Sequence, residues 1–505
     1  MQFIAGIIIK VSIKVKGDEF MVEFNAKIKN HMIIVIGATG ELMRKKLLPA
    51  LYRLYERGII SQTMPIVCVG RKKLTKNSYI DLIEPEKVIP DVNNMILSGF
   101  LQLIHYIRSD FENGDLGSFC STIDKLDKKN NCRGNKIFYF ATPQALYTAV
   151  SDSLSEMPFM KGRGWKRVVY ENPYGESQKH ADELNKMISK CFDENQMYRV
   201  SHYVDKRVMD DLMAFRFGNL LLKNAWDSKF VDNVQITLSE KEGVSEDGRK
   251  NFFFGVVKNM FLMEGLQLLS FAGMDEPRSM TADDIRGVRL RSLKALADLN
   301  TKDVVVGQYG SGKIDGGKVK GYRQEEGTVK DSKIETYFAA KFTFKKGGLK
   351  NIPVYVRCGK RLKADQSRID LVLKEASGKI FENKSLKSNV ITMLASPESG
   401  LGLSLNNRLK GDAMKVEDFN LDSVKGKGYK VNTPEAYESI IYDVMKGDMA
   451  NFSCFDEIKA GWKIVEPLVE IVKRKKVKFP NYSAGNDGPK DSVDLLKKDK
   501  RAWQF

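Results

Sequence analysis

Short apolar runs alternate with helical patterns through the first two hundred residues of the chain. Four such runs cover residues 32–36, 66–69, 137–141 and 168–170. The first leads through a glycine turn into residues 43–55, where apolar side chains recur at helical spacing. Runs that are apolar on both faces and alternate with helices are typical of a parallel sheet covered on both sides. We therefore predict a doubly wound parallel sheet over about residues 31–200.

The turn after the first run has the residues of a dinucleotide-phosphate cradle. It reads Gly37, Ala38, Thr39, Gly40, Glu41 and Leu42, and a helical pattern follows at once. Glycines allow the backbone to approach a pyrophosphate, and the start of a helix supplies free N–H donors. Met43 stands where a third glycine is often found, which weakens the motif when it is taken alone. Its place between a predicted strand and a predicted helix supports it. The sequence thus predicts a Rossmann-like fold.

Basic residues follow the second run, where such a fold meets the adenosine ribose. The sequence there is Gly70, Arg71, Lys72 and Lys73. An acidic residue at this place favours a free 2′-hydroxyl, whereas basic residues favour a 2′-phosphate. Arg71, with Lys72 or Lys73, therefore predicts a preference for NADP. The alternative is a solvated basic turn.

A second candidate anion site lies at residues 199–206, which read R-V-S-H-Y-V-D-K. An extended run ends here and a helical pattern begins, which places His202 and Lys206 four residues apart on one helical face. Together with Tyr203 and the N–H groups of a first helical turn, they could bind a phosphate. The alternative is a solvated helix start with a satisfied histidine.

Composition narrows the class of protein. The chain has 505 residues, of which 42% are hydrophobic, and this length is enough for two or more domains. Its net charge of +18 favours anionic ligands. The lysines are spread along the whole chain, so we expect no nucleic-acid partner. No apolar run reaches membrane-spanning length, and residues 1–30 read as an extra hairpin or a mobile extension rather than a secretory signal. The six scattered cysteines include no C-x-x-C pair, so we expect no metal site, no disulfides and a cytoplasmic location.

From Ile33 to Trp503 the chain resembles the glucose-6-phosphate dehydrogenase family. The glycine turn resembles that family's G-A-S-G-D-L, and residues 171–175, E-N-P-Y-G, resemble its E-K-P-F-G. Residues 199–206 resemble its signature R-I-D-H-Y-L-G-K. Further matches, in the family's order, are 215–219 (F-R-F-G-N), 306–309 (V-G-Q-Y), 320–322 (K-G-Y), 356–360 (V-R-C-G-K) and 434–438 (P-E-A-Y-E).

This resemblance implies an α/β domain over residues 31–200 that binds NADP. It also implies an α+β substrate and dimerisation domain over residues 201–505, with a large, mostly antiparallel sheet and helices. The implied activity is oxidation of glucose 6-phosphate to 6-phosphogluconolactone, the first step of the oxidative pentose phosphate pathway, in a homodimer or homotetramer. Carried over position by position, the sugar phosphate is held by His202, Tyr203 and Lys206, the sugar by Glu240 and Lys360, and the cofactor by Gly37, Thr39, Gly40, Glu41, Leu42 and Arg71.

The resemblance breaks at the catalytic base. Gap-free alignment places Glu264 where the family has a histidine, and Ser201 where it has the aspartate that orients this histidine. Asn172 stands at the lysine of E-K-P. The other three histidines, at 31, 105 and 180, lie in segments that cannot supply the base. The resemblance also breaks at the family's second, structural NADP site, whose R-x-Q-P pattern is replaced by residues 394–397, L-A-S-P.

Glu264 lies on an apolar helical face with Val257, Met260, Phe261 and Leu268. Burial raises the pKa of a carboxyl group toward the range of a base at neutral pH. The first hypothesis is therefore a dehydrogenase in which Glu264 replaces the histidine. In the second, Glu264 is paired with a neighbour such as Lys258 or Ser201, and the protein binds ligands without turnover as a regulatory subunit. The third is a dehydrogenase for another sugar phosphate.

Overall fold

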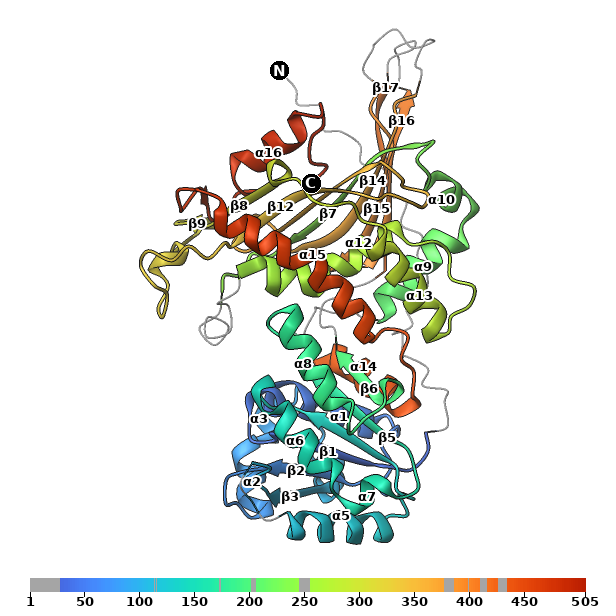
Figure 1. Ribbon diagram of the computed structural model, residues 1–505, viewed down its shortest axis with the longest axis vertical. Helices are drawn as coiled ribbons and strands as arrows, with labels where there is room; N and C mark the ends of the chain where they lie inside the picture. Colours follow the sequence, from blue (N-terminus) through green and yellow to red (C-terminus); the bar gives the residue numbers. More distant parts are fainter. Residues whose placement is uncertain are drawn as a thin grey trace.

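The computed structural model describes residues 28–112, 114, 116–171, 174–200, 206–244, 255–376, 386–397, 399–408, 416–425 and 434–505. Its N-terminal part contains a six-stranded parallel sheet in the order β3-β2-β1-β4-β5-β6 (Figure 1). The strands are β1 (Met32–Ile36), β2 (Ile66–Gly70), β3 (Ile104–Arg108), β4 (Lys136–Phe140), β5 (Lys166–Glu171) and β6 (Met197–Val200). The four apolar runs thus form β1, β2, β4 and β5.

Helices cover both faces of this sheet. They are η1 (Met43–Leu47), α1 (Leu48–Glu56), α2 (Lys76–Ile83), α3 (Pro85–Val88), α4 (Asn94–Leu103), α5 (Gly117–Lys129), α6 (Tyr147–Ser155), α7 (Pro158–Lys161) and α8 (Gln178–Ile188), with short 3₁₀ turns η2 (Gln144–Leu146) and η3 (Glu194–Gln196). Alternate residues of β1 face opposite ways, so Ile33 and Val35 join one buried cluster and Ile34 joins the other. The predicted doubly wound sheet is confirmed.

The C-terminal part is built on an eight-stranded sheet in the order β17-β16-β15-β14-β7-β13-β12-β8. Neighbouring strands are antiparallel except for β7 and β13, which are parallel. The strands are β7 (Val231–Ser239), β8 (Val304–Gly307), β12 (Tyr337–Thr343), β13 (Pro353–Gly359), β14 (Gln366–Leu373), β15 (Val390–Ser396), β16 (Ser399–Arg408) and β17 (Val416–Lys425). The predicted large, mostly antiparallel sheet is therefore confirmed.

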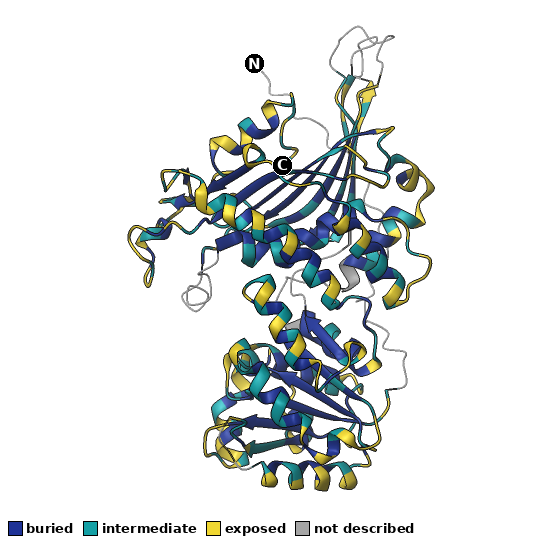
Figure 2. Ribbon diagram, in the orientation of Figure 1, coloured by how far each residue is buried: buried dark blue, intermediate teal, exposed yellow. Residues whose placement is uncertain are grey.

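The remaining elements come from the same part of the chain as this sheet. They are α9 (Lys206–Gly218), α10 (Leu220–Ala225), η4 (Val257–Gly265), α12 (Leu266–Gly273), α13 (Ala282–Lys294), α14 (Pro434–Lys446), α15 (Phe455–Arg474) and α16 (Lys490–Lys497), the short strands β9 (Tyr309–Gly310), β10 (Gly312–Ile314), β11 (Gly317–Val319) and β18 (Tyr482–Ser483), and 3₁₀ turns η5 (Thr301–Asp303) and η6 (Tyr322–Gln324). Figure 2 shows the strands of both sheets largely buried, while exposed residues lie on the outer faces of the helices. Among the described residues, no helix is both long and apolar enough to cross a membrane.

Helix α14 follows the large sheet in sequence but packs on the N-terminal sheet (Figure 1). Its residues Tyr437 and Ile441 belong to the same buried cluster as Ile33 of β1. Arg167 of β5 donates hydrogen bonds of 2.7 Å to the carbonyls of Val444 and Met445 at the end of this helix. The core of the N-terminal part is thus completed by residues from near the end of the chain.

Candidate active site

The glycine turn after β1 is held against the end of β2. The N–H groups of Gly37 and Ala38 donate to the carbonyl of Val69 at 3.0 and 2.9 Å. Gly37 has a φ of 88°, and a Cβ atom there would lie 2.5 Å from the carbonyl oxygen of Ala141. Only glycine fits this position, because both the backbone angle and the close approach of Ala141, just after β4, exclude a side chain.

A cavity of about 290 Å³ opens beside this turn, at the carboxyl ends of the parallel strands. Of the residues predicted to bind the cofactor, those that line it are Gly37, Thr39, Gly40 and Arg71. Glu41 and Leu42 do not line it, and Glu41 instead forms an exposed ion pair of 3.0 Å with Lys45. Lys72 lines the cavity beside Arg71, whereas Lys73 does not.

Two further lining residues, Ser109 and Thr142, were not among the predicted site residues. Both hydroxyl oxygens are buried and have no hydrogen-bond partner among the residues that the structure describes. Buried polar groups are normally satisfied, so a bound polar ligand is the natural partner for these two hydroxyls. Since Ser109 follows β3 and Thr142 follows β4, the rule that ligands bind at the carboxyl ends of parallel strands could have found them. The cradle and these hydroxyls fit a dinucleotide.

The second group of site residues lies at one end of the large sheet. Ser239 at the end of β7 pairs with Gly359 at the end of β13 and with Gln366 at the start of β14. This register brings Glu240, Lys360 and Ser367 together, although they are distant in sequence. The carboxylate of Glu240 forms an ion pair with the ammonium of Lys360. The backbone N–H of Glu240 donates to the carbonyl of Gly359 at 3.0 Å. The two predicted sugar-contacting residues are thus paired with each other.

Glu264 lies on η4, which crosses this end of the sheet against β7 and β13. The carboxyl group is buried, with 2% of the residue exposed. Its Oε1 accepts a hydrogen bond of 2.6 Å from the hydroxyl of Ser367. Burial raises the pKa of Glu264 to about 8, although the Ser367 hydrogen bond and the Lys360 ammonium act in the opposite direction. The expectation of a desolvated carboxyl from the apolar helical face agrees with this geometry.

The partner of Glu264 that the structure describes is Ser367, not Lys258. Lys258 donates from Nζ to the carbonyl of Glu176 at 2.9 Å, and its ammonium lies 5.5 Å from the centre of the Trp462 ring. The electrostatic neighbours of Glu264 include Glu240 and Lys360. The Glu264 carboxyl, whose pKa is raised to about 8, therefore interacts electrostatically with the carboxylate and the ammonium of the predicted sugar site.

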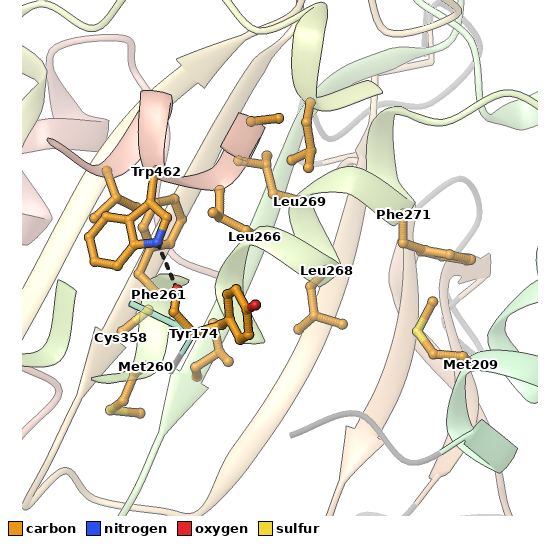
Figure 3. Packing of buried hydrophobic residues seen from close by; sticks show 14 of the residues in the cluster. Tyr174, Met209, Met260, Phe261, Leu266, Leu268, Leu269, Phe271, Cys358 and Trp462 are labelled. Carbon is orange, nitrogen blue, oxygen red and sulfur yellow. Dashed lines mark hydrogen bonds between the residues drawn. The ribbon is translucent and has the colours of Figure 1, made fainter. Parts of the chain in front are cut away.

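Close packing fixes the helix that carries Glu264. Phe261 stacks on Phe342 of β12 with ring centres 5.3 Å apart. Figure 3 shows Phe261, Leu266 and Trp462 in one buried layer, with Trp462 reaching the carbonyl of Tyr174. Residues 257–265 form a wide π-helical turn, a feature that occurs often at functional sites. The position of Glu264 is therefore set by a closely packed support.

Several predicted residues lie outside the description. Ser201, His202 and Tyr203 fall in residues 201–205, and Asn172 is also outside the described residues. Lys206 begins α9, whose predicted helical pattern is confirmed over Lys206–Gly218, but its side chain is not described. The phosphate clamp therefore stays a prediction.

The remaining histidines lie in the N-terminal part. His31 is buried immediately before β1, His105 is on β3, and His180 is in the first turn of α8. Among the residues that the structure describes, no group of three or more His, Cys, Asp or Glu side chains is placed to hold a metal ion.

Comparison with known proteins assigns the family. Residues 34–211 match the family model "Glucose-6-phosphate dehydrogenase, NAD binding domain", and residues 213–504 match "Glucose-6-phosphate dehydrogenase, C-terminal domain". Among curated relatives, glucose-6-phosphate 1-dehydrogenase of Chlamydia pneumoniae is 31% identical, covering 94% of this chain and 96% of its own. The Bacillus subtilis enzyme is 30% identical, covering 94% and 98%.

Solved structures agree. A glucose-6-phosphate dehydrogenase in complex with its substrate glucose-6-phosphate superposes with a TM-score of 0.86 at 26% identity, covering 95% of this chain and all of that one. The glucose-6-phosphate 1-dehydrogenase of Mycobacterium avium gives a TM-score of 0.81 at 25% identity, covering 94% and 99%. A dinucleotide cradle joined to a large sheet with an acid–base cluster defines a nicotinamide-dependent oxidoreductase. Within that class, the chain belongs to the glucose-6-phosphate dehydrogenase family.

Proposed function

We propose that the chain oxidises glucose 6-phosphate at C1 with NADP and that Glu264 is the base. The observation that carries this proposal is the buried Glu264 carboxyl, whose pKa of about 8 lies in the range of a base near neutral pH and which is coupled electrostatically to Glu240 and Lys360. A buried carboxylate is a stronger base than a solvated one, because burial disfavours its charged form.

The proposed roles combine the family resemblance with the positions of those side chains that the structure describes. Glu240 and Lys360 hold the sugar hydroxyls, and His202, Tyr203 and Lys206 hold the phosphate. Arg71, with Lys72 beside it, selects the 2′-phosphate of NADP, since both are basic and line the cofactor cavity. When bound, the nicotinamide ring supplies the acceptor for the hydride that leaves C1. Glu264 takes the proton of the C1 hydroxyl, which leaves the carbonyl of 6-phosphogluconolactone.

Ser367 takes over part of what an orienting aspartate does for a histidine. Its hydroxyl fixes Oε1 of Glu264, so the other oxygen is the one left to meet the substrate. A carboxylate has no tautomer to select, and a neutral hydroxyl donor stabilises its charged form. The replacements at positions 201 and 264 are therefore compatible with each other.

The decisive experiment is spectrophotometry at 340 nm with glucose 6-phosphate and either NADP or NAD, across about pH 5 to 9 to bracket a carboxylate base. We expect kcat/KM with NADP to rise toward alkaline pH with an apparent pKa near 8. Glu264→Gln should lower kcat by about 10² to 10⁴. The matched control is Glu326→Gln, which changes an exposed glutamate outside the site. Full turnover in Glu264→Gln would exclude Glu264 as the base.

Binding without turnover is the second candidate, and one observation favours it. A carboxyl with a pKa of about 8 is mostly protonated at pH 7, and a protonated acid cannot accept the substrate proton. Calorimetric binding of glucose 6-phosphate with no absorbance change at any pH would support this function. If other sugar phosphates give turnover where glucose 6-phosphate does not, the chain is a dehydrogenase of altered specificity.

We also propose that the protein forms a homodimer or homotetramer through the large sheet and works in the reducing cytoplasm, as the first enzyme of the oxidative pentose phosphate pathway. All six cysteines are free thiols, which agrees with a reducing compartment. Light scattering coupled to size-exclusion chromatography tests the assembly, and a mass near that of one chain would contradict it.

A further inference from the structure

Glu335 is a second buried carboxyl next to the helix that carries Glu264. It lies just before β12, and 6% of the residue is exposed. Its Oε1 accepts a hydrogen bond of 3.3 Å from the N–H of Val257, and its backbone carbonyl accepts one of 3.2 Å from the N–H of Val256. These two donors lie at the start of η4, where N–H groups have no partner within the helix. Glu335 therefore anchors the start of η4 with two oxygens.

Gly255 shows how closely the carboxyl fits. A Cβ atom at Gly255 would lie 2.0 Å from Oε1 of Glu335, and the residue has a φ of 66°. A side chain at position 255 would therefore displace the carboxyl from the start of the helix. The turn before η4 and the Glu335 side chain occupy complementary spaces.

The next residue, Thr336, forms hydrogen bonds with the turn that carries Lys360. Its carbonyl accepts hydrogen bonds from the N–H of Lys360 at 3.0 Å and from the hydroxyl of Tyr482 at 3.1 Å. The same hydroxyl lies 2.7 Å from the carbonyl of Lys360. Two adjacent residues thus connect the helix of Glu264 with the turn of Lys360.

We propose that Glu335 is a positioning residue, which fixes the start of η4 and so sets where Glu264 lies relative to Glu240 and Lys360. The inference deepens the proposed function, because it concerns the same base. Glu264 follows Val257 by seven residues on one continuous helix, so a change at the helix start moves the carboxyl along or around the helix axis.

The electrostatics support this role. Burial raises the pKa of Glu335 to about 7, whereas its own N–H, the N–H of Val257 and the ammonium of Lys258 act to lower it. Near neutral pH a substantial share of the protein therefore carries a charged acceptor at the start of η4. A charged acceptor forms a stronger hydrogen bond than a neutral one and also favours the positive end of the helix dipole.

The test uses Glu335→Gln, which keeps a similar shape and an acceptor oxygen but removes the charge. Glu326→Gln is the matched control, since it makes the same change at an exposed site nearby. Hydrogen exchange measured by mass spectrometry on a peptide covering residues 255–266 should be about tenfold faster in Glu335→Gln at pH 8, the loss of about 1.4 kcal/mol expected for one charged hydrogen bond. Exchange equal to that of the Glu326→Gln control would overturn the anchor.

A second readout follows the position of Glu264 without requiring turnover. The melting temperature of the single variant Glu335→Gln is compared with that of the double variant that also carries Glu264→Gln, from about pH 5 to 9. The pH dependence of the difference in melting temperature reports the titration of Glu264 alone. A loosened η4 admits water, so the apparent pKa of Glu264 should fall by about one unit relative to the same comparison in the wild-type background. An unchanged titration of Glu264 would show that Glu335 supports the fold alone and would overturn the positioning role. An inactive wild-type protein would contradict the proposed function but leave both readouts decisive for Glu335.

Discussion

The hydroxyl of Ser367 donates a hydrogen bond of 2.6 Å to Oε1 of Glu264, across 103 residues of sequence. A hydroxyl that donates to a carboxylate stabilises its charged form, so this contact works against the burial that raises the pKa of Glu264. The pair therefore sets the pH at which Glu264 can accept a proton.

Ser367→Ala should raise the apparent pKa of Glu264 above about 8, because the hydrogen bond that lowers it is lost. We expect kcat/KM at pH 7 to fall about tenfold and to recover in part toward pH 9, as a rise of about one unit in the pKa implies. The measurement is the pH profile of kcat/KM. Ser121→Ala on the exposed side of α5 is the control, and a profile identical to that control would refute the role of Ser367.

Glu264→Gln should stabilise the folded protein at alkaline pH. The pKa of Glu264 is raised from 4.5 to about 8, so its favourable contribution is complete below about pH 4.5 and is lost as the pH rises through 8. At pH 9 the variant should be more stable than the wild type by about 2 to 4 kcal/mol, and at pH 5 the two should be similar. Denaturant unfolding at both pH values measures this, and a difference independent of pH would contradict it.

His31 should make the fold sensitive to acid. Burial lowers the pKa of this histidine from 6.5 to about 4, and its Nδ1 donates to the carbonyl of Lys29 at 2.8 Å. The contribution of neutral His31 to the free energy of unfolding is therefore complete above about pH 6.5. It falls by roughly 2 to 3 kcal/mol as the pH falls toward 4. His31→Gln should flatten the slope of the melting temperature between these pH values. His180→Gln is the control and should keep the wild-type slope.

Arg71→Ala should weaken NADP binding by about tenfold to a hundredfold, while NAD binding changes little. The guanidinium lines the cofactor cavity, where it can pair with a 2′-phosphate. Fluorescence or calorimetric titration with each cofactor measures the ratio without requiring turnover. Lys73→Ala provides the comparison, since Lys73 is exposed and does not line the cavity. Equal losses for NADP and NAD would contradict a role in selecting the 2′-phosphate.

Ser109→Ala separates binding from folding. The buried hydroxyl has no hydrogen-bond partner in the described part of the chain, so its removal should leave the melting temperature of the free protein unchanged or higher. Cofactor affinity should nevertheless fall about threefold to tenfold, as expected for one lost hydrogen bond. Differential scanning fluorimetry with and without NADP measures both. A lower melting temperature without cofactor would show that the hydroxyl supports the fold instead.

Local patterns were enough to predict much of the architecture. The runs of β1, β2, β4 and β5 are apolar on both faces, which is typical of buried parallel strands. Strand β3 was not predicted, because His105 and Arg108 interrupt its apolar pattern and three of its residues are only half-buried. The apolar helical face around Glu264 correctly indicated a buried carboxyl.

Contacts between distant segments could not be predicted in this way. Ser367 carries no motif, and it meets Glu264 only because β14 pairs with β7 at the end of the sheet that η4 crosses. Ser109 and Thr142 likewise belong to one cavity only through the order of the parallel strands. In each case the side chain can be read from the sequence, but the residues that it contacts depend on the order and register of the strands.

Helix α14 has a consequence for synthesis on the ribosome. The cluster that contains Ile33 and Val35 also contains Tyr437 and Ile441, which emerge after more than four hundred other residues have been translated. Until then part of one apolar face of the first sheet stays uncovered, and exposed apolar surface on a growing chain invites aggregation or chaperone binding. A chain cut before Pro434 should therefore lose the cofactor-binding half together with the half that was shortened.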